Sequence, residues 1–399
     1  MAKVGVVMPA YYQQEALIRL AVQSVLNQTW RDFNFVIVVD GAPDLVPLFD
    51  ELTQGDPRVS IVAYPENQGV AFALNYGFEI VMDQGCEYLT WVSTDNVYYP
   101  NFLDALVREM DRSHPNVGIV YSAFRHVLEN GLAAHPAEVI REVREFQHRP
   151  KEALLEGCII GPSFLQRTKY CRMLDGYRFK YIQDYDYWIR LTDYCDIQYI
   201  AVELMDYRIN SPFSLSTHIS EDPAKHRVCW NEVHQSHYET RQRRGIKADI
   251  SALFLIRPGE VQQAQQALAK IVDQYETNFE LIIVGLTTQR EVEAVLEPYT
   301  DPRIRVLYYS YHRDVNALRK ALAKTKSDWC VVYDSAHVTA DLGYLRSVRR
   351  SGVLDKSKAS AITMPGRSVV ASNEIVSLYQ TLAVRPALMK FVENAIHDS

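Results

Sequence analysis

Four short stretches directly follow apolar runs near the start of the chain, where their residues could contact a ligand. They are Pro9–Tyr12, Asp40–Asp44, Pro65–Gly69 and Ser93–Asn96. Asp40 carries an evident chemistry, because its carboxylate can accept the imide N–H of a pyrimidine base. The small Gly41 beside it would let such a ligand approach closely. The alternative is a purely local turn, since Asp and Gly are common turn residues.

The apolar runs before these stretches are predicted to be strands, and the segments between them to be helices. The predicted strands are Val4–Met8, Phe35–Val39, Val59–Ala63 and Tyr88–Val92. Leu17, Leu20, Ala21 and Val25 keep helical spacing, and Val70–Val81 also favours a helix. This alternation is typical of an α/β fold with a largely parallel sheet. Ligands of such sheets bind beyond the carboxyl ends of the strands, where the four stretches lie.

The composition is that of an ordinary globular protein and excludes several classes. The chain has 399 residues, 48% apolar and 23% charged, with a formal net charge of −7. This length suits about two or three domains, and the acidic balance argues against a nucleic-acid partner. The six cysteines form no Cys-x-x-Cys pair and are interpreted as reduced thiols. Because no apolar run approaches the ~20 residues of a membrane span, and Pro9 cuts the first run too short for a signal peptide, we expect a cytoplasmic protein.

Two parts of the chain resemble each other in the same order, which predicts a duplicated domain. Ser24–Val38 resembles Lys270–Val284, and the pattern of Tyr88–Val97 recurs in Trp329–Val338. Asp56-Pro-Arg-Val likewise recurs as Asp301-Pro-Arg-Ile. We therefore expect one domain at residues 1–245 and a second, smaller one at 250–399.

The basic stretch Arg241–Lys247 lies at the expected boundary between these domains. Its simplest interpretation is a solvated linker. The alternative is a contact with an anionic lipid or polymer, which would place the protein peripherally at the inner face of the membrane.

Six segments of the first part resemble, in order, the motifs of family 2 glycosyltransferases, which are inverting enzymes with a GT-A fold. The segments are Val7–Tyr12, Ser24–Thr29, Phe35–Asp44, Glu66–Gly77, Trp91–Asn96 and Gly176–Leu191. The last of them leads into Tyr207-Arg208, so that the resemblance covers roughly residues 3–220. It implies a nucleotide-diphosphate sugar as donor and a hydroxyl of a glycan or lipid-linked molecule as acceptor.

The resemblance also implies which residues hold the donor nucleotide. These donor-side candidates are Pro9, Ala10, Tyr11, Asp40, Asn67, Gly69 and Thr94. Tyr11 could equally be a plain packing aromatic. Leu74 departs from the family pattern, because many members carry a basic residue at that position. One expected contact with the base or the diphosphate is therefore missing.

Ser93-Thr-Asp95-Asn96 stands where the family usually has Asp-x-Asp-Asp, its metal and diphosphate site. The resemblance implies Mg²⁺ or Mn²⁺ at Asp95, because carboxylate oxygens are natural ligands of hard cations. Ser93 and Asn96 replace the outer acids, so that affinity for the metal should be modest. His218 is a further metal candidate in the closing segment. The alternative for Asp95 is a helix cap before a predicted helix at Tyr98–Asp111.

The acceptor side and the catalytic base are implied by the last motif. Asp184 matches the position of the general base that takes the proton of the acceptor hydroxyl. Asp186 is interpreted as the partner of Arg190 in an ion pair across one helical turn. The acceptor-side candidates are Gly161, Pro162, Ser163, Gly176 and Trp188. Trp188 has an alternative place in the core.

The second part keeps the sheet pattern and loses the chemistry. Val284-Gly285-Leu286 replaces Val39-Asp40-Gly41, and Ala336 replaces Asp95. We therefore expect this part to be non-catalytic and to serve dimerisation or to hold the acceptor. Two other functions stay open for the whole chain: a non-catalytic carbohydrate- or nucleotide-binding scaffold, and a nucleotidyltransferase. The second is weaker, because Pro9–Glu15 has no Gly or Lys to form a triphosphate loop.

Overall fold

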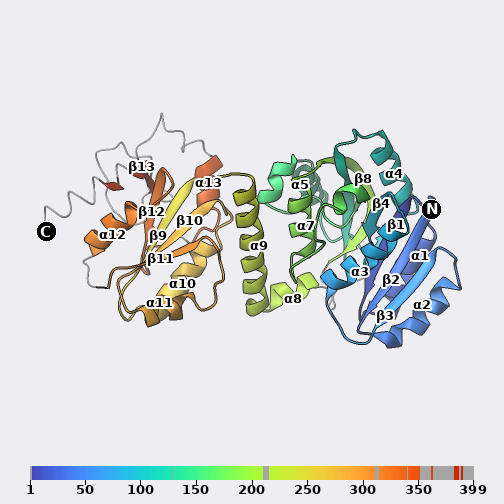
Figure 1. Ribbon diagram of the computed structural model, residues 1–399, viewed down its shortest axis with the longest axis horizontal. Helices are drawn as coiled ribbons and strands as arrows, with labels where there is room; N and C mark the ends of the chain where they lie inside the picture. The colour runs from blue at the N-terminus through green and yellow to red at the C-terminus, as the bar shows by residue number, and fades with distance from the viewer. Residues whose placement is uncertain are drawn as a thin grey trace. The chain divides into compact units, whose positions relative to one another are not determined.

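The structure is a computed structural model that describes residues 2–128, 130–209, 215–310, 314–338, 340–350, 361–362, 382–385 and 388–389. The chain divides into two compact units, Met1–Glu232 and Val233–Ser399. The division falls inside helix α9 (Pro223–Arg243), whereas the sequence places the boundary after that helix. Each unit contains a largely parallel sheet with helices on both faces (Figure 1).

The first unit is built on an eight-stranded sheet with the order β3-β2-β1-β4-β7-β6-β8-β5. Its strands are β1 (Val4–Ala10), β2 (Phe33–Asp40), β3 (Val59–Tyr64), β4 (Tyr88–Trp91), β5 (Val97–Tyr98), β6 (Val117–Val127), β7 (Phe164–Arg167) and β8 (Asp196–Arg208). The first four are mutually parallel, and β7 runs antiparallel to both of its neighbours. The four strands predicted from the apolar runs are thus confirmed.

Helices cover the two faces of this sheet because side chains alternate along each strand. Val4, Val6 and Met8 of β1 pack into one core cluster, and Val7 packs into the other. The first cluster involves α1 (Glu15–Leu26), α2 (Val46–Thr53) and α4 (Phe102–Arg112), and the second α3 (Val70–Asp83) and α7 (Gln183–Leu191). Shorter or peripheral helices are η1 (Pro43–Leu45), α5 (Ala137–Gln147), η2 (Lys151–Leu155), α6 (Thr168–Cys171) and α8 (Leu215–Glu221).

The second unit has a six-stranded sheet with the order β11-β10-β9-β12-β14-β13. Its elements are β9 (Ile250–Ile256), α10 (Val261–Val272), β10 (Phe279–Gly285), α11 (Gln289–Leu296), β11 (Ile304–Tyr308), α12 (Asp314–Leu322), β12 (Trp329–Tyr333), α13 (Tyr344–Arg350), β13 (Ala361–Ile362) and β14 (Leu382–Val384). This order repeats that of the first six strands of the other sheet, with β14 antiparallel to β12 as β7 is to β4. The predicted second α/β unit is present.

The pairing register is also shared by the two sheets. Ile250 of β9 pairs with Phe279 and Trp329, whereas Val4 of β1 pairs with Phe33 and Tyr88. Phe279 of β10 corresponds to Phe33 of β2, so that Leu286, seven residues later, corresponds to Asp40. The sequence comparison placed Gly285 there, one residue too early. The acid is absent from the second unit in either alignment.

Among the described residues, no helix combines the length and the apolar character needed to cross a membrane.

Candidate functional site

The four predicted ligand-binding stretches meet at one edge of the first sheet. Ala10 of β1 pairs with Val39 of β2, and Asp40 pairs with Tyr64 at the end of β3. The amide of Val92, directly after β4, donates to the carbonyl of Val7 (2.9 Å). The carboxyl ends of these parallel strands therefore bring the loops that follow them together, as expected for an α/β ligand site.

Asp40 joins two of these loops through its carboxylate. Its oxygens accept the backbone N–H groups of Gln68 (2.6 Å) and Gly69 (2.9 Å), and the Asn67 amide donates to its carbonyl (3.2 Å). The side chain is only 3% exposed. Because each carboxylate oxygen has a second lone pair, Asp40 keeps capacity for one more donor. Asp40 therefore holds the loop after β2 against the loop after β3, which contains Asn67 and Gly69.

Gly41 serves the same loop contact and not the approach of a ligand, which corrects the expectation from sequence. Its φ is +69°, and a Cβ built there would lie 2.2 Å from the backbone nitrogen of Asn67. The loop itself therefore occupies the space that a side chain would need.

The remaining donor-side candidates differ in what they expose. Tyr11 is 48% exposed directly after β1, where its ring is available to stack on a flat ligand. Ala10 and Thr94 are buried and Pro9 is half-buried, so that their roles at the donor stay predictions. Leu74, at the position where a basic residue was expected, is buried in the core.

The loop that carries Asp95 is fastened to strand β8. Asn96 donates to the Ser93 hydroxyl (2.6 Å) and accepts the backbone N–H of Arg208 (2.8 Å). The Arg208 guanidinium donates to the carbonyl of Asp95 (3.1 Å). The two residues that replace the family's outer acids thus hold the loop in place. Asp95 precedes β5, and α4 begins only at Phe102, so the alternative role as a helix cap is wrong.

Asp95 itself is a half-buried carboxylate. Burial raises its pKa, and the Ser93 hydrogen bond and the charge of Arg208 act in the opposite direction. A divalent cation would favour the ionised form in the same way as Arg208. The donor set of Asp95 and neighbouring hydroxyl oxygens fits Mg²⁺ or Mn²⁺.

The described part of the chain contains no group of three or more His, Cys, Asp or Glu residues arranged to hold a metal. The remaining ligands of a cation at Asp95 would therefore have to come from the donor diphosphate and water. His218 is exposed in α8, after residues 210–214, which lie outside the described residues. Its metal role stays a prediction.

Asp184 lies in the first turn of α7, where the helix N-terminus favours a negative charge. It accepts the backbone N–H of Tyr185 (2.7 Å), and it has no ion-pair partner among the described residues. Burial raises its pKa above the ordinary value of an aspartate. Burial raises the pKa of the Cys158 and Cys229 thiols, and the charge of Asp184 adds to this effect. The roles of Asp184 as the base and of Gly161 at the acceptor stay predictions.

A buried ion pair fixes the helix that carries Asp184. Asp186 is fully buried and accepts two hydrogen bonds from Arg178 (both 2.9 Å) and one from Arg190 (2.8 Å). The predicted Asp186–Arg190 pair is therefore confirmed. Arg190 also donates to the carbonyl of Gly176 (2.7 Å), which ties the end of the preceding loop to α7.

The loop before α7 is held at two more points. Gly176 has φ +85°, and a Cβ there would lie 2.4 Å from the Asn75 side-chain oxygen. Asn75 also exchanges hydrogen bonds with the backbone of Tyr177 (2.6 and 2.8 Å). Glu232 accepts the backbone N–H groups of Lys180 (3.0 Å) and Tyr181 (2.9 Å). Gly176 therefore shapes this loop, and Glu232 is a positioning residue that no sequence motif signals.

Two acceptor-side candidates cannot present their side chains to a ligand. Trp188 is 0% exposed and packs edge-on against Phe164, with 4.4 Å between ring centroids. Ser163 is equally buried, and its hydroxyl lies 2.5 Å from that of Ser122. The acceptor-stacking role of Trp188 is therefore wrong, and its core alternative holds. Pro162 is buried as well, whereas Gly161 is half-buried beside the Phe124 ring, with φ +71°.

A comparison with protein families identifies the segment that carries these loops. The sequence model of the family Glycosyl transferase family 2 matches residues 5–174. This segment is a family 2 glycosyltransferase domain. Together with the mixed, mostly parallel sheet, the match confirms the expected GT-A class of the first unit. The sequence model does not reach Asp184.

Relatives of this glycosyltransferase domain include an uncharacterised glycosyltransferase of Rickettsia felis, 24% identical over 358 residues (86% of this chain, 54% of the relative). The O-antigen biosynthesis glycosyltransferase WbnJ of Escherichia coli is 25% identical over 215 residues (51% of this chain, 79% of the relative). The chain spans 36% of the length of a Rickettsia bellii relative and 54% of the length of the relatives from Rickettsia felis and Rickettsia conorii. A solved mannosyltransferase of Pyrobaculum calidifontis, in complex with GDP-Man and Mn²⁺, is similar with TM-score 0.45 and 14% identity, over 61% of this chain and 64% of its own.

Replacement of Asp186 by Asn tests the brace of α7. Asp186→Asn would leave the buried Arg190 without its charge partner, and we expect the free energy of unfolding to fall by about 3 kcal/mol. Urea unfolding followed by circular dichroism measures this change. Asp104→Asn is the matched control, because Asp104 and Arg108 form an exposed i,i+4 pair (2.8 Å) that should contribute less than about 0.5 kcal/mol. Equal effects of both substitutions would contradict the assignment.

Proposed function

We propose that the chain transfers a sugar from a nucleotide diphosphate to an acceptor hydroxyl, with inversion at the anomeric carbon. The observation that carries this proposal is the contrast between two neighbouring carboxylates of α7. Asp186 is saturated by two arginines, whereas Asp184, two residues earlier, has no ion-pair partner in the part of the chain that the structure describes. Because the carboxylate of Asp184 has no such ion pair among the described residues, it is available to take a proton.

The reaction would be a single in-line displacement. The acceptor oxygen forms a bond to the anomeric carbon while its proton moves to Asp184. At the same time the bond from that carbon to the phosphate oxygen breaks, and the nucleoside diphosphate leaves with the electron pair. General-base assistance of this kind typically contributes a factor of about 10²–10⁴ in rate.

The leaving diphosphate gains charge, and a divalent cation bound to it would stabilise that charge. Asp95 would hold the cation, together with oxygens of the diphosphate itself. Arg208 adds a fixed positive charge at the same loop, since its guanidinium contacts the Asp95 carbonyl. Asp40 and Tyr11 would contact the base of the donor. An exposed ring for stacking and a carboxylate with a spare lone pair support this role.

The base, sugar and acceptor are assigned only by class. A glycan or lipid-linked hydroxyl is the proposed acceptor, in a cytoplasmic protein that associates with the membrane surface. A panel of UDP-, GDP- and dTDP-sugars with Mn²⁺, followed by thermal shift and slow donor hydrolysis, would identify the donor.

The second unit is proposed to be a degenerate copy of the first that does not catalyse transfer. The shared strand order and pairing register support the duplication. Ala336 occupies the position of Asp95, and the nearby Asp334 is engaged by His337 (2.7 Å) and Arg257 (3.0 Å). Dimerisation through this unit stays a prediction from sequence.

Asp184→Asn should abolish turnover and keep donor binding, because it removes the base and leaves the donor loops intact. The variant should also be at least as stable as the wild type at pH 7. The folded-state pKa of Asp184 is raised, so its ionisation costs stability as the pH rises above the unfolded value of 3.8. Product formation, donor titration calorimetry and urea unfolding measure the three quantities. Transfer at the wild-type rate would rule out Asp184 as the base.

The pH dependence of kcat/KM tests the same residue independently. Because burial raises the pKa of Asp184, its basic form appears only at higher pH than that of an exposed aspartate. We expect the acid limb of the profile to lie above the ordinary pKa of an aspartate and to move when Asp184 is changed to Glu. An acid limb at the ordinary aspartate value, unchanged in Asp184→Glu, would count against the assignment.

Asp95→Ala should weaken donor binding in the presence of Mn²⁺ and have little effect in its absence, because the carboxylate acts through the cation. Calorimetric titration of the donor with and without Mn²⁺ measures the difference. Asp104→Ala, on the exposed face of α4, is the control. An Asp95→Ala variant that keeps the full metal-dependent gain in affinity would remove Asp95 from the metal site.

A further inference from the structure

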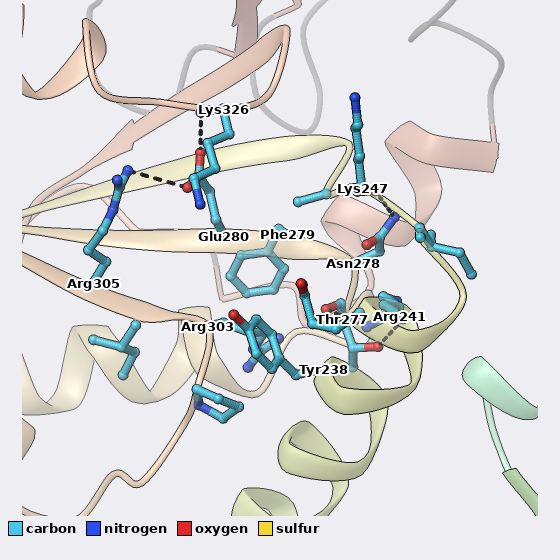
Figure 2. A pocket seen from close by; sticks show the side chains of 16 residues that line it. Tyr238, Arg241, Lys247, Thr277, Asn278, Phe279, Glu280, Arg303, Arg305 and Lys326 are labelled. Atoms are coloured by element: carbon cyan, nitrogen blue, oxygen red, sulfur yellow. Dashed lines mark hydrogen bonds and ion pairs between the residues drawn. The ribbon is translucent and has the colours of Figure 1, made fainter. Parts of the chain in front are cut away.

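The second unit contains a cavity of about 550 Å³ at the amino ends of its parallel strands. Its lining includes Phe279, the first residue of β10, Ile304, the first of β11, and Lys326, three residues before β12. The C-terminal part of α9 closes another side with Tyr238 and Arg241 (Figure 2). This edge is opposite to the carboxyl ends where α/β folds place their usual ligands. The cavity is therefore unrelated to any remnant of a donor site.

The lining of the cavity is strongly basic, although the chain as a whole is acidic. The lining cations are Arg241, Lys247, Arg303, Arg305 and Lys326, and the lining acid is Glu280. Glu280 is engaged by Arg305 (3.4 Å), by the Lys326 amide (2.7 Å) and by the Ser251 hydroxyl (2.5 Å). A concave site with this excess of one sign attracts ligands of the opposite charge.

Part of this positive charge belongs to the fold, and part is available to a ligand. Arg303 is held by the buried Asp301 (2.6 Å), and Arg241 by the carbonyl and hydroxyl of Thr277. By contrast, neither the Lys247 nor the Lys326 ammonium has an ion-pair partner among the described residues. Arg305 donates through one guanidinium nitrogen to the Lys324 carbonyl (2.6 Å) and to Glu280 (3.4 Å), and its side chain is 38% exposed, so that the rest of the guanidinium is accessible.

The first unit provides an internal comparison. Its Arg58 is bound by Asp56 and packs 4.4 Å from the Phe33 ring, as Arg303 does with Asp301 and Phe279. This arginine, aspartate and phenylalanine device is therefore structural in both units, including the unpartnered Nη1 that both arginines share.

Two of the other lining cations, Arg305 and Lys326, have no basic counterpart in the first unit. In the shared strand register, Ser60 of β3 stands at the position of Arg305 of β11. Trp329 of β12 corresponds to Tyr88 of β4, so that Lys326, three residues earlier, corresponds to Gly85. Basic residues thus stand in the second unit where the first has small neutral ones. The arrangement of Arg303 with Asp301 and Phe279 does not need these basic residues, since the first unit forms it without them.

One exposed ring adjoins the cations. In Figure 2 the Phe279 ring lies between Arg303 and Tyr238 on one side and Glu280 and Lys326 on the other, but it is only 2% exposed and packs against Arg303 (4.4 Å), so that it forms part of the cavity wall. Tyr238 is 37% exposed, and Ile246, Pro302 and Ile304 add apolar surface. Aromatic faces beside charged donors suit a ligand that has both a sugar ring and an anionic group.

We propose that this cavity binds a phosphorylated sugar unit, with the phosphate at Arg305 and Lys326 and the sugar ring against Tyr238. Lys247 extends away from the Phe279 ring in Figure 2, and its flexible stem lets it reach an outer anionic group. The unit could be a free sugar phosphate or one member of a phosphate-bearing glycan chain. Because every lining residue belongs to the second unit, the proposal is independent of the catalytic assignments.

Calorimetric titration of the full chain tests this site. The probes are glucose 1-phosphate against glucose, phosphorylated dextran against neutral dextran, and inorganic phosphate. We expect both phosphorylated probes to bind more tightly than their neutral counterparts and than inorganic phosphate. Tighter binding of glucose 1-phosphate assigns the site to a free sugar phosphate, and tighter binding of phosphorylated dextran per phosphate assigns it to a chain.

The double variant Lys247→Ala/Lys326→Ala should weaken binding of the phosphorylated probe about tenfold, the effect expected for two partly exposed charges. Lys270→Ala/Arg319→Ala removes the same charge from exposed positions of α10 and α12 and should change nothing. Tyr238→Ala should weaken the sugar phosphate and leave inorganic phosphate unchanged. Equal losses in both double variants, or equal affinity for phosphate and sugar phosphate, would overturn the proposal. So would the absence of binding to the wild type.

Discussion

The buried carboxylate of Asp186 is the interaction on which the candidate active site depends. Two arginines neutralise it, one from the loop before α7 and one from the next turn of the helix. A buried charge without such partners would destabilise the fold by several kcal/mol. Because the pair is complete, the helix starts at a fixed place, and Asp184 can stay unpaired at its N-terminus. Asp186 thus contributes to the stability of the fold, and Asp184, two residues earlier, is the residue that we propose as the base.

The strand pattern and the order of the loops could be read from the sequence, because alternating apolar runs report directly on a parallel sheet. The ion pair of Asp186 was equally readable, since i,i+4 spacing fixes the geometry within a helix. The sequence could not decide between the ligand contact and the core for Trp188, nor show that Ser163 is buried, because this burial depends on contacts with Phe164 and Ser122, which are distant in the sequence. The role of Glu232 could not be predicted either, because the backbone groups that it holds, those of Lys180 and Tyr181, are 52 and 51 residues earlier in the chain.

Gly41 illustrates a subtler limit of the sequence. The sequence predicts that a ligand approaches Gly41 closely, but in the structure its missing side chain makes room for the backbone of Asn67. A glycine at this position indicates that another group approaches the backbone closely, but it does not identify that group. The second unit shows the same limit. The repeated Asp-Pro-Arg motif indicates an arginine–aspartate pair in both units, whereas Arg305 and Lys326 stand at repeat positions that are not basic in the first unit.

Helix α9 runs without interruption through the division between the two units, and Glu232, at that division, holds the loop before α7. Multidomain proteins usually exchange parts at flexible linkers, where a cut removes few contacts. In this chain a recombination event at the unit boundary would break a helix and endanger the loop that leads to Asp184. The two units are therefore expected to be inherited together, and changes to the second to accumulate in place.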